Sequence, residues 1–160
     1  MPNDNRLTRV HVDLPNHPST GGEGMWALAL GDELYELRNV PLQAYDLNLG
    51  DVVLATRDSP ELVPEIREVV RRSGHRTMRV VFKPSVPEAR KLDLVQSLRF
   101  LSASFERGTE RCFALDLPPE ADITRVQAIL DEWQDKGWGE YETCESRVPG
   151  SFDDAPEELT

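Results

Sequence analysis

The chain has 160 residues, and its 18 lysines and arginines against 29 aspartates and glutamates give a formal net charge of −11. This length suits one domain or two small, closely packed lobes, and it sustains a core without disulfides or metal. No apolar run approaches the roughly 20 residues of a membrane span, and the first residues lack the apolar region of a signal peptide. The negative charge argues against general nucleic-acid binding. The composition therefore predicts an acidic, soluble, cytoplasmic globular protein.

The first half of the chain is typical of strands and turns, because apolar and polar residues alternate there with a period of two. The strands predicted in this half and at its end are 8–14, 25–30, 34–40, 52–56, 65–72 and 76–82. Segment 62–72 also has helical spacing, but Pro64 would interrupt a helix, so we favour a strand from Glu65 to Arg72. Ser73-Gly74-His75 is then the turn into the next strand.

Helical patterns begin after Lys83. The spacing of Ser85 and Glu88 is that of a capping box and predicts a helix start, and Asp122 can cap a second helix that ends before Gly137. Further strands are predicted at 104–106, 111–117 and 138–144. From Arg76 the order is strand, helix, strand, strand, helix, strand, which is the ferredoxin-like order.

The predicted fold class is therefore α+β. A β-rich N-terminal half over residues 1–75, forming a curled sheet or a small barrel, packs on a ferredoxin-like half over residues 76–147. The two halves form either two closely packed lobes or one domain. Residues 148–160 are acidic with few apolar side chains and predict a disordered tail.

The segment from Arg67 to Lys83 departs from the acidic composition, because it holds six basic residues against Glu68 alone. If 73–75 is a hairpin loop, strand parity gathers most of these cations on one face. Two explanations are favoured: neighbouring carboxylates such as Glu65 or the acidic tail compensate the charge, or the face binds a carboxylate, a phosphate or an acidic peptide. A nucleic-acid patch is a third, less favoured because no aromatic residue lies between the arginines to stack on bases. The candidate ligand-binding residues are Arg67, Arg71, His75, Arg76, Arg79 and Lys83.

Signatures of catalysis or of a cofactor are lacking in the sequence. It has no nucleophile elbow, no zinc-protease motif and no phosphate-binding loop, so we expect no catalytic residue, no metal and no cofactor. His11 shares a predicted strand face with Asp13 and could act as a general base, but a structural role is the simpler interpretation. Cys112 and Cys144 are expected to be free thiols, with a disulfide as the alternative if the last strands bring them together.

The three tryptophans, Trp26, Trp133 and Trp138, are most simply core or lobe-interface residues, although Trp138 could instead border a pocket.

Several segments of the first half resemble one family. They are Val10-His11-Val12-Asp13-Leu14-Pro15, Met25-Trp26-Ala27, Arg38-Asn39-Val40-Pro41, Asn48-Leu49-Gly50-Asp51-Val52-Val53 and Ser73-Gly74-His75-Arg76-Thr77. In their order and spacing they resemble an uncharacterised bacterial group, the domain-of-unknown-function family DUF4265. The second half is similar mainly in its pattern of strands and helices. The resemblance implies no reaction or ligand.

Together these features predict a non-enzymatic binding or regulatory protein. It would engage a basic protein through its acidic surface, or a small anionic ligand through the arginines. The alternatives are a small-metabolite sensor, or an enzyme with a site between the two lobes that uses His11 or His75. Neither nucleic acid nor a membrane is an expected partner.

Overall fold

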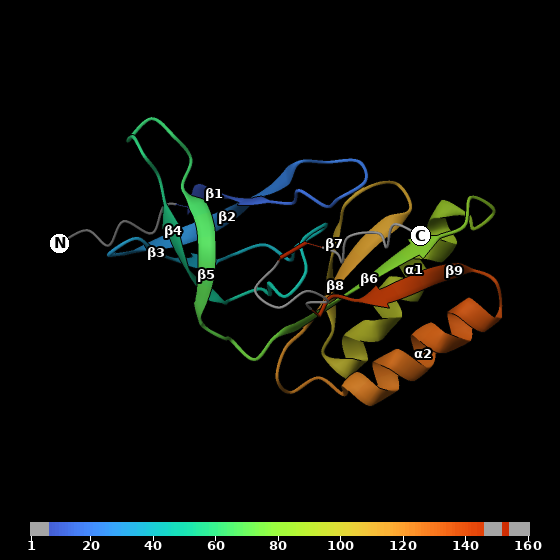
Figure 1. Cartoon of the computed structure of the whole chain (residues 1–160). Coiled ribbons are helices and arrows are strands. Elements are labelled where there is room, and N and C mark those ends of the chain that lie inside the picture. The colour runs from blue at the N-terminus through green and yellow to red at the C-terminus, as the bar shows by residue number, and fades with distance from the viewer. Residues whose placement is uncertain (1–6, 146–151, 154–160) are drawn as a thin grey trace, which may run out of the picture. The chain divides into compact units, whose positions relative to one another are not determined.

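The computed structural model describes residues 7–145 and 152–153, and it is a mixed α+β structure with two sheets and two α-helices (Figure 1). Its contacts divide the chain into two units, Met1–Ser73 with Glu145–Thr160, and Gly74–Cys144. We name them the barrel unit and the helical unit. None of the helices in the described residues is long and apolar enough to cross a membrane.

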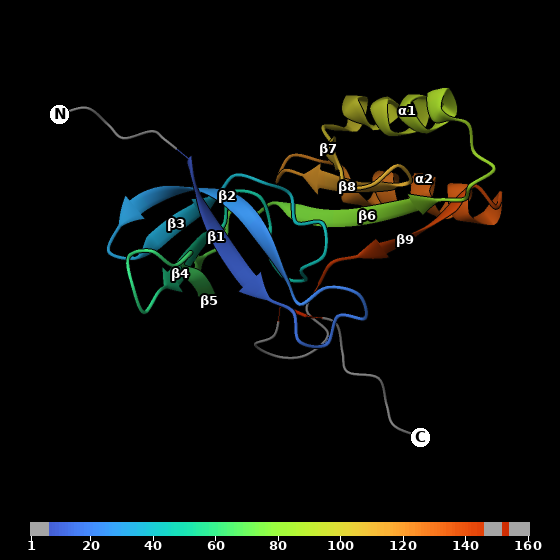
Figure 2. The same ribbon diagram turned by 90° about the horizontal axis from the view of Figure 1, so that it is seen from above.

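Five strands of the barrel unit close into a barrel in chain order, so the curled sheet expected for this half is a closed one (Figure 2). They are β1 Leu7–Asp13, β2 Gly22–Gly31, β3 Leu34–Leu37, β4 Val52–Thr56 and β5 Glu65–Arg71. Sequential neighbours pair antiparallel, and a parallel pairing of β1 with β5 closes the ring. Segment 62–72, whose spacing also fitted a helix, thus contains the strand β5, as Pro64 indicated.

Alternation along the strands supplies the barrel core. In β1, Val10 and Val12 are buried while His11 between them faces outward, and Met25 and Ala27 are the buried residues of β2. The core residues are Val10, Val12, Leu14, Met25, Ala27, Leu37, Ala44, Leu47, Val53, Ala55 and Ile66. Because successive side chains of a strand point to opposite faces, the remaining side chains of these strands lie on the outer face of the barrel.

Phe152 and Asp153 belong to the segment expected to be a disordered tail, 148–160, most of which lies outside the described residues. Phe152 packs against the barrel core, and its carbonyl accepts a hydrogen bond of 2.7 Å from the Tyr45 N–H. Asp153 is buried and its carboxylate accepts from the Asn16 N–H. At these two positions the chain is held against the barrel by burial and hydrogen bonds, which the acidic composition did not indicate.

The helical unit is a four-stranded sheet in the order β7-β8-β6-β9, and all three neighbouring pairs are antiparallel. Its elements are β6 Arg76–Phe82, α1 Glu88–Ser97, a short 3-10 helix Leu98–Leu101, β7 Ser104–Arg107, β8 Cys112–Leu117, α2 Ile123–Asp135 and β9 Gly139–Thr143. Its core includes Phe82 and Phe113, whose rings meet edge to face at 5.7 Å, together with Val126, Leu130 and Trp133.

The two predicted helix starts have different outcomes. Asp122 caps α2, since its Oδ1 accepts the Arg125 N–H at 3.1 Å, and Gly137 after this helix has φ of 75°. The capping box predicted for α1 is wrong: Pro87 is the N-cap and no side chain caps the helix. Ser85 lies before the cap, in the turn closed by the hydrogen bond from the Val86 N–H to the Lys83 carbonyl.

Candidate functional site

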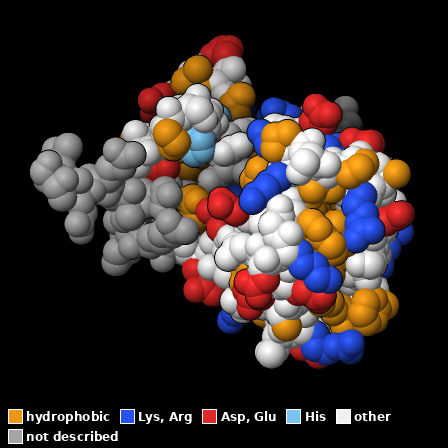
Figure 3. Space-filling model, turned by 90° about the vertical axis from the view of Figure 1, so that its right-hand side faces the viewer, with side chains coloured by type: hydrophobic (Ala, Val, Ile, Leu, Met, Phe, Trp, Pro, Cys, Tyr) orange, Lys and Arg blue, Asp and Glu red, His pale blue; other side chains and the backbone are white. Residues whose placement is uncertain are grey.

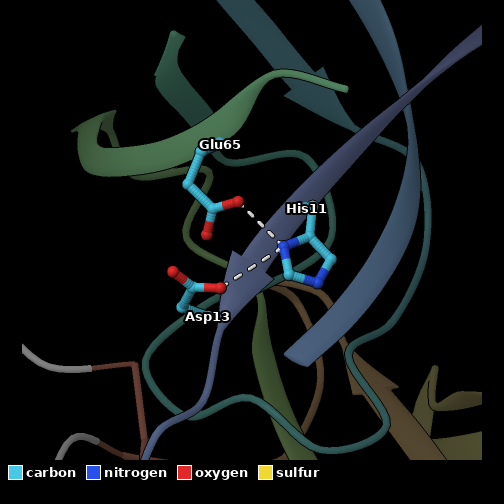
Figure 4. A group of neighbouring side chains, drawn as sticks. All are labelled: His11, Asp13 and Glu65. Atoms are coloured by element: carbon cyan, nitrogen blue, oxygen red, sulfur yellow. Dashed lines mark hydrogen bonds and ion pairs between the residues drawn. The ribbon is translucent and has the colours of Figure 1, made fainter. Parts of the chain in front are cut away.

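Three polar side chains meet on the outer face of the barrel, where β1 runs beside the start of β5 (Figure 4). His11 and Asp13 are two residues apart in β1, so both point away from the core that Val12 enters. The parallel register places Glu65 beside His11, and the His11 N–H donates to the Pro64 carbonyl at 2.9 Å. Backbone pairing therefore fixes which side chains come together.

The His11 Nδ1 atom is the centre of this cluster. It lies 2.8 Å from Glu65 Oε2 and 3.7 Å from Asp13 Oδ1, and the three groups each offer an atom within 4.8 Å of the others. Nδ1 carries a hydrogen that it donates to Glu65, because a carboxylate has none to give. The cluster thus joins one imidazole nitrogen and two carboxylates around a single point.

Two glycines of β2 determine how the β1 side chains lie. A Cβ atom at Gly22 would come within 2.4 Å of His11 Nε2 and 2.7 Å of the Val12 carbonyl oxygen, and one at Gly24 within 2.8 Å of the Arg9 guanidinium. Only glycine leaves this room, so the His11 ring lies over Gly22 and turns Nδ1 toward the carboxylates.

A cleft of about 380 Å³ opens at the cluster. Its walls come from the end of β1, the loop between β4 and β5, and the start of β5. They consist of His11, Asp13, Thr56, Arg57, Asp58, Leu62, Val63, Glu65 and Arg67. Three carboxylates, two guanidinium groups and two aliphatic side chains therefore surround one space.

Glu65 is the most enclosed acid of the cleft, with 20% of its side chain exposed. Its Oε2 accepts from His11, while its Oε1 is buried and has no hydrogen-bond partner among the described residues. Leaving a buried acceptor unpaired costs about 1–3 kcal/mol, more for a charged group. Such an atom in a folded protein calls for a physical explanation, and a bound ligand is one.

The two arginines of the cleft are tied to its wall by hydrogen bonds. Arg67 Nε donates to Thr56 Oγ1 at 2.9 Å, and Arg57 donates to the carbonyls of Pro60 and Leu62 at 3.1 and 3.3 Å. Each guanidinium has five N–H donors, so both keep donors beyond these contacts.

An apolar surface covers the outer face of β1 and β2 at the start of β1, away from the cleft at the end of that strand. Trp26 is 42% exposed, Leu7 and Leu30 are about half exposed, and Leu7 lies opposite the partly exposed Leu28. Arg9 lies opposite Trp26, and its guanidinium carbon is 4.8 Å from the centre of the indole ring. We name Leu7, Trp26, Leu28 and Leu30 the Trp26 surface.

The tryptophans thus have different environments. Trp133 is a core residue, and Trp138 is partly buried beneath Arg90 and Lys136. Trp26, expected in a core or at a lobe interface, is not a core residue. Its alternation with buried Met25 and Ala27 places it on the outer face.

The predicted hairpin of arginines is wrong, because β5 pairs with β4 and β1 whereas β6 pairs with β8 and β9. Arg67 and Arg71 are exposed in the barrel unit, and the other candidates lie in or beside β6 of the helical unit. Arg79 is only 3% exposed, and its Nε donates to Glu142 at 3.0 Å. Of the six candidates, Arg67, Arg71, His75, Arg76, Arg79 and Lys83, the cleft includes Arg67. Anion binding by these residues remains a prediction.

A second histidine–carboxylate pair lies in the helical unit. His75 Nδ1 is 2.8 Å from Asp116 Oδ1 and 3.1 Å from Oδ2, and 5% of the Asp116 side chain is exposed. Burial raises the pKa of Asp116 above its usual value, although the bond to His75 opposes this effect. No local pattern links these two residues, which are 41 positions apart, so the pair was not predicted.

The cysteines are free thiols, as the simpler interpretation predicted. Cys144 is buried, and burial raises the pKa of the Cys112 thiol, which keeps that group protonated and poorly nucleophilic.

The face of the molecule in Figure 3 carries basic and acidic side chains in alternation. In the helical unit, Arg107 of β7 contacts Glu88 of α1 at 2.5 and 2.8 Å, and this hydrogen-bonded contact lowers the pKa of Glu88 to about 2. The charges of Arg107 and Glu88 therefore balance each other within the chain.

Residues 23–141 match a family described as a domain of unknown function, DUF4265. Among solved structures, a crystal structure of a hypothetical protein from Neisseria gonorrhoeae is similar, with a TM-score of 0.75 and 18% sequence identity over 88% of this chain and 95% of that chain. At this identity the similarity concerns the fold. Among curated proteins, no sequence matches the chain significantly.

Proposed function

The chain belongs to the DUF4265 family, and we propose that it is a non-enzymatic binding protein that engages a basic protein partner through its barrel. The single observation that carries this proposal is the exposed Trp26 surface on a strongly acidic unit.

The apolar part of this surface fits a protein partner. Tryptophan is enriched among residues that dominate binding free energies, and clustered exposed apolar side chains mark interaction sites. Arg9 stacks on the Trp26 ring and restricts its motion, so little side-chain entropy would be lost on binding.

The charge of the barrel favours a basic partner. From residue 7 to residue 73 there are eleven acidic against six basic side chains, a net charge of −5. From residue 74 to residue 144 there are twelve against ten, a net charge of −2. Long-range attraction of this sign speeds the encounter with a cationic protein and weakens as salt is added.

The helical unit is proposed to be ferredoxin-like. Its element order from β6 to β9, with a strand, a helix, two strands, a helix and a strand, supports this classification, as does the antiparallel sheet order β7-β8-β6-β9.

The test of the binding proposal uses a synthetic peptide that alternates lysine and leucine, with the variants Trp26→Ala and Phe100→Ala. Phe100 is 67% exposed in the helical unit, so its variant is a control for loss of an exposed aromatic ring. We expect Trp26→Ala to weaken binding at least tenfold, about 1.4 kcal/mol, and Phe100→Ala to change it less than twofold. The association rate should fall steeply as salt increases. Equal effects of both variants, or an association rate indifferent to salt, would contradict the proposal.

A second candidate function is favoured by one observation, the hydrogen bond from His11 Nδ1 to Glu65 within an open cleft. This bond leaves Nε2 as the basic nitrogen, which is the arrangement of a general base oriented by a carboxylate. Hydrolysis of 4-nitrophenyl acetate that is lost in His11→Ala and kept in His17→Ala would support an enzyme. Equal rates in both variants would exclude this role of His11.

A further inference from the structure

We infer that His11, Asp13 and Glu65 form a binding site for a divalent transition-metal ion at the cleft of the barrel. This site is independent of the proposed partner surface, which lies at the other end of the outer face of β1 and β2.

The spacing of the three side chains suits one ion. Nitrogen and oxygen ligands lie about 2.0–2.2 Å from such an ion, which puts two ligand atoms about 3–3.5 Å from each other. The observed separations from His11 Nδ1, 2.8 Å to Glu65 and 3.7 Å to Asp13, lie on either side of this range. Small rotations of the two carboxylates would complete the geometry, and the partly exposed cluster leaves them room.

The unpartnered oxygen of Glu65 is a second, independent observation that indicates a ligand. Oε1 is buried without a hydrogen-bond donor in the described part of the chain, and Figure 4 shows it turned to the side where Asp13 lies. An ion bound to Nδ1, with the ring hydrogen moved to Nε2 so that the imidazole stays neutral, would supply positive charge to both oxygens of this carboxylate at once. The cost of the unpaired acceptor would then be removed by binding.

Charge and donor type specify the class of ion. A neutral imidazole with two carboxylates carries a charge of −2, which a divalent cation balances. Imidazole suits Zn²⁺, Fe²⁺ and Ni²⁺, whereas Mg²⁺ and Ca²⁺ prefer oxygen alone. Mn²⁺ takes carboxylate and water oxygens, which Asp13, Glu65 and the open cleft supply beside His11. Three protein ligands leave further positions for water, since the cleft is open on this side.

The surroundings hold the ligands in place. Gly22 gives the His11 ring the space to lie flat, with Nδ1 toward Glu65, and parallel pairing fixes His11 beside Glu65. The positive charges of Arg57 and Arg67 would oppose a cation, but both guanidinium groups are hydrogen-bonded to the cleft wall rather than to the three ligands.

The test is a titration of the full chain, treated with chelator beforehand, with Mn²⁺ followed by electron paramagnetic resonance and with Zn²⁺ followed by calorimetry. We expect one ion per chain, and affinity that falls in acid because the ion competes with the proton on Nδ1. His11→Ala and Glu65→Gln should each weaken binding at least tenfold. Mn²⁺ is the decisive probe, since the two free thiols can bind Zn²⁺ on their own.

Matched variants separate the site from general electrostatics and from folding. Asp58→Asn removes one negative charge, as Asp13→Asn does, but at a cleft residue outside the cluster of His11, Asp13 and Glu65. It should alter Mn²⁺ affinity less than twofold. Asp13→Asn changes a side chain that is 72% exposed, so it should keep the fold and still weaken binding. No Mn²⁺ binding by the native chain, or equal losses in Asp58→Asn and Asp13→Asn, would overturn the inference. Neither outcome would affect the binding test of Trp26.

Discussion

Two histidine–carboxylate pairs in the described part of the chain, His11 with Glu65 and His75 with Asp116, have the same closest distance, 2.8 Å, and opposite surroundings. His11 and Glu65 lie in a cleft of the barrel beside Asp13, and one Glu65 oxygen has no hydrogen-bond partner within residues 7–145 and 152–153. His75 pairs with both oxygens of a nearly fully buried Asp116 in the helical unit. A short contact between these residue types therefore does not define a site. Access, a third ligand and an unsatisfied atom distinguish a binding cluster from a structural pair.

The largest expected effect concerns stability. Asp116→Ala removes the partner of His75 from a buried position of β8 and should lower the free energy of unfolding by about 2 kcal/mol. Asp13→Ala removes an exposed side chain and should change it by less than about 0.5 kcal/mol. Urea denaturation of both variants measures this difference. Equal losses would mean that both carboxylates have a structural role.

The next effect concerns ion binding and separates the two histidines directly. His75→Ala should leave Mn²⁺ affinity within twofold of the native value, whereas His11→Ala should reduce it at least tenfold, because His11 has two carboxylates beside it in a cleft. Circular dichroism of each variant checks that both remain folded. A loss of affinity in His75→Ala as large as that in His11→Ala would remove the distinction between the pairs.

The smallest effect concerns pH. Burial raises the pKa of Asp116 above its ordinary 3.8, so the protonated carboxyl is favoured in the folded state. Because Asp116 binds its proton more tightly in the folded than in the unfolded chain, protonation adds to the free energy of unfolding. This gain is fully present below the ordinary pKa of the carboxyl and is lost as pH rises through the pKa of Asp116 in the folded protein. As the pH is lowered toward 4, the native chain should therefore gain stability relative to Asp116→Asn. Free energies of unfolding of the two proteins across this range measure the gain, and a constant difference would contradict it.

Local patterns predicted much of the fold. Alternation identified β1, β-prone residues identified β4, Pro64 indicated that β5 is a strand, and Asp122 marked the start of α2. Each of these features depends on residues close together in the chain, so each could be predicted from the sequence alone. The pairing of β5 and β6 was predicted wrongly, because two strands joined by a short turn can enter different sheets, and neither strand's pattern shows which neighbour it will have.

The candidate site was only half predicted. Strand parity placed His11 and Asp13 on one face, but Glu65 is 54 residues away from His11 and was considered only as a counter-charge for arginines. The parallel closure of the barrel brings it there, and this contact is not local. Gly22 and Gly24 were a signal in the sequence, because glycines in a strand mark places where other groups approach closely.

The metal site of the barrel is tested most directly by the anomalous difference density of a crystal soaked in Mn²⁺. We predict a peak bounded by His11 Nδ1, Asp13 and Glu65, at about 2.2 Å from each ligand atom. A soaked crystal with that position empty, or with its strongest peak beside His75 and Asp116, would contradict the assignment.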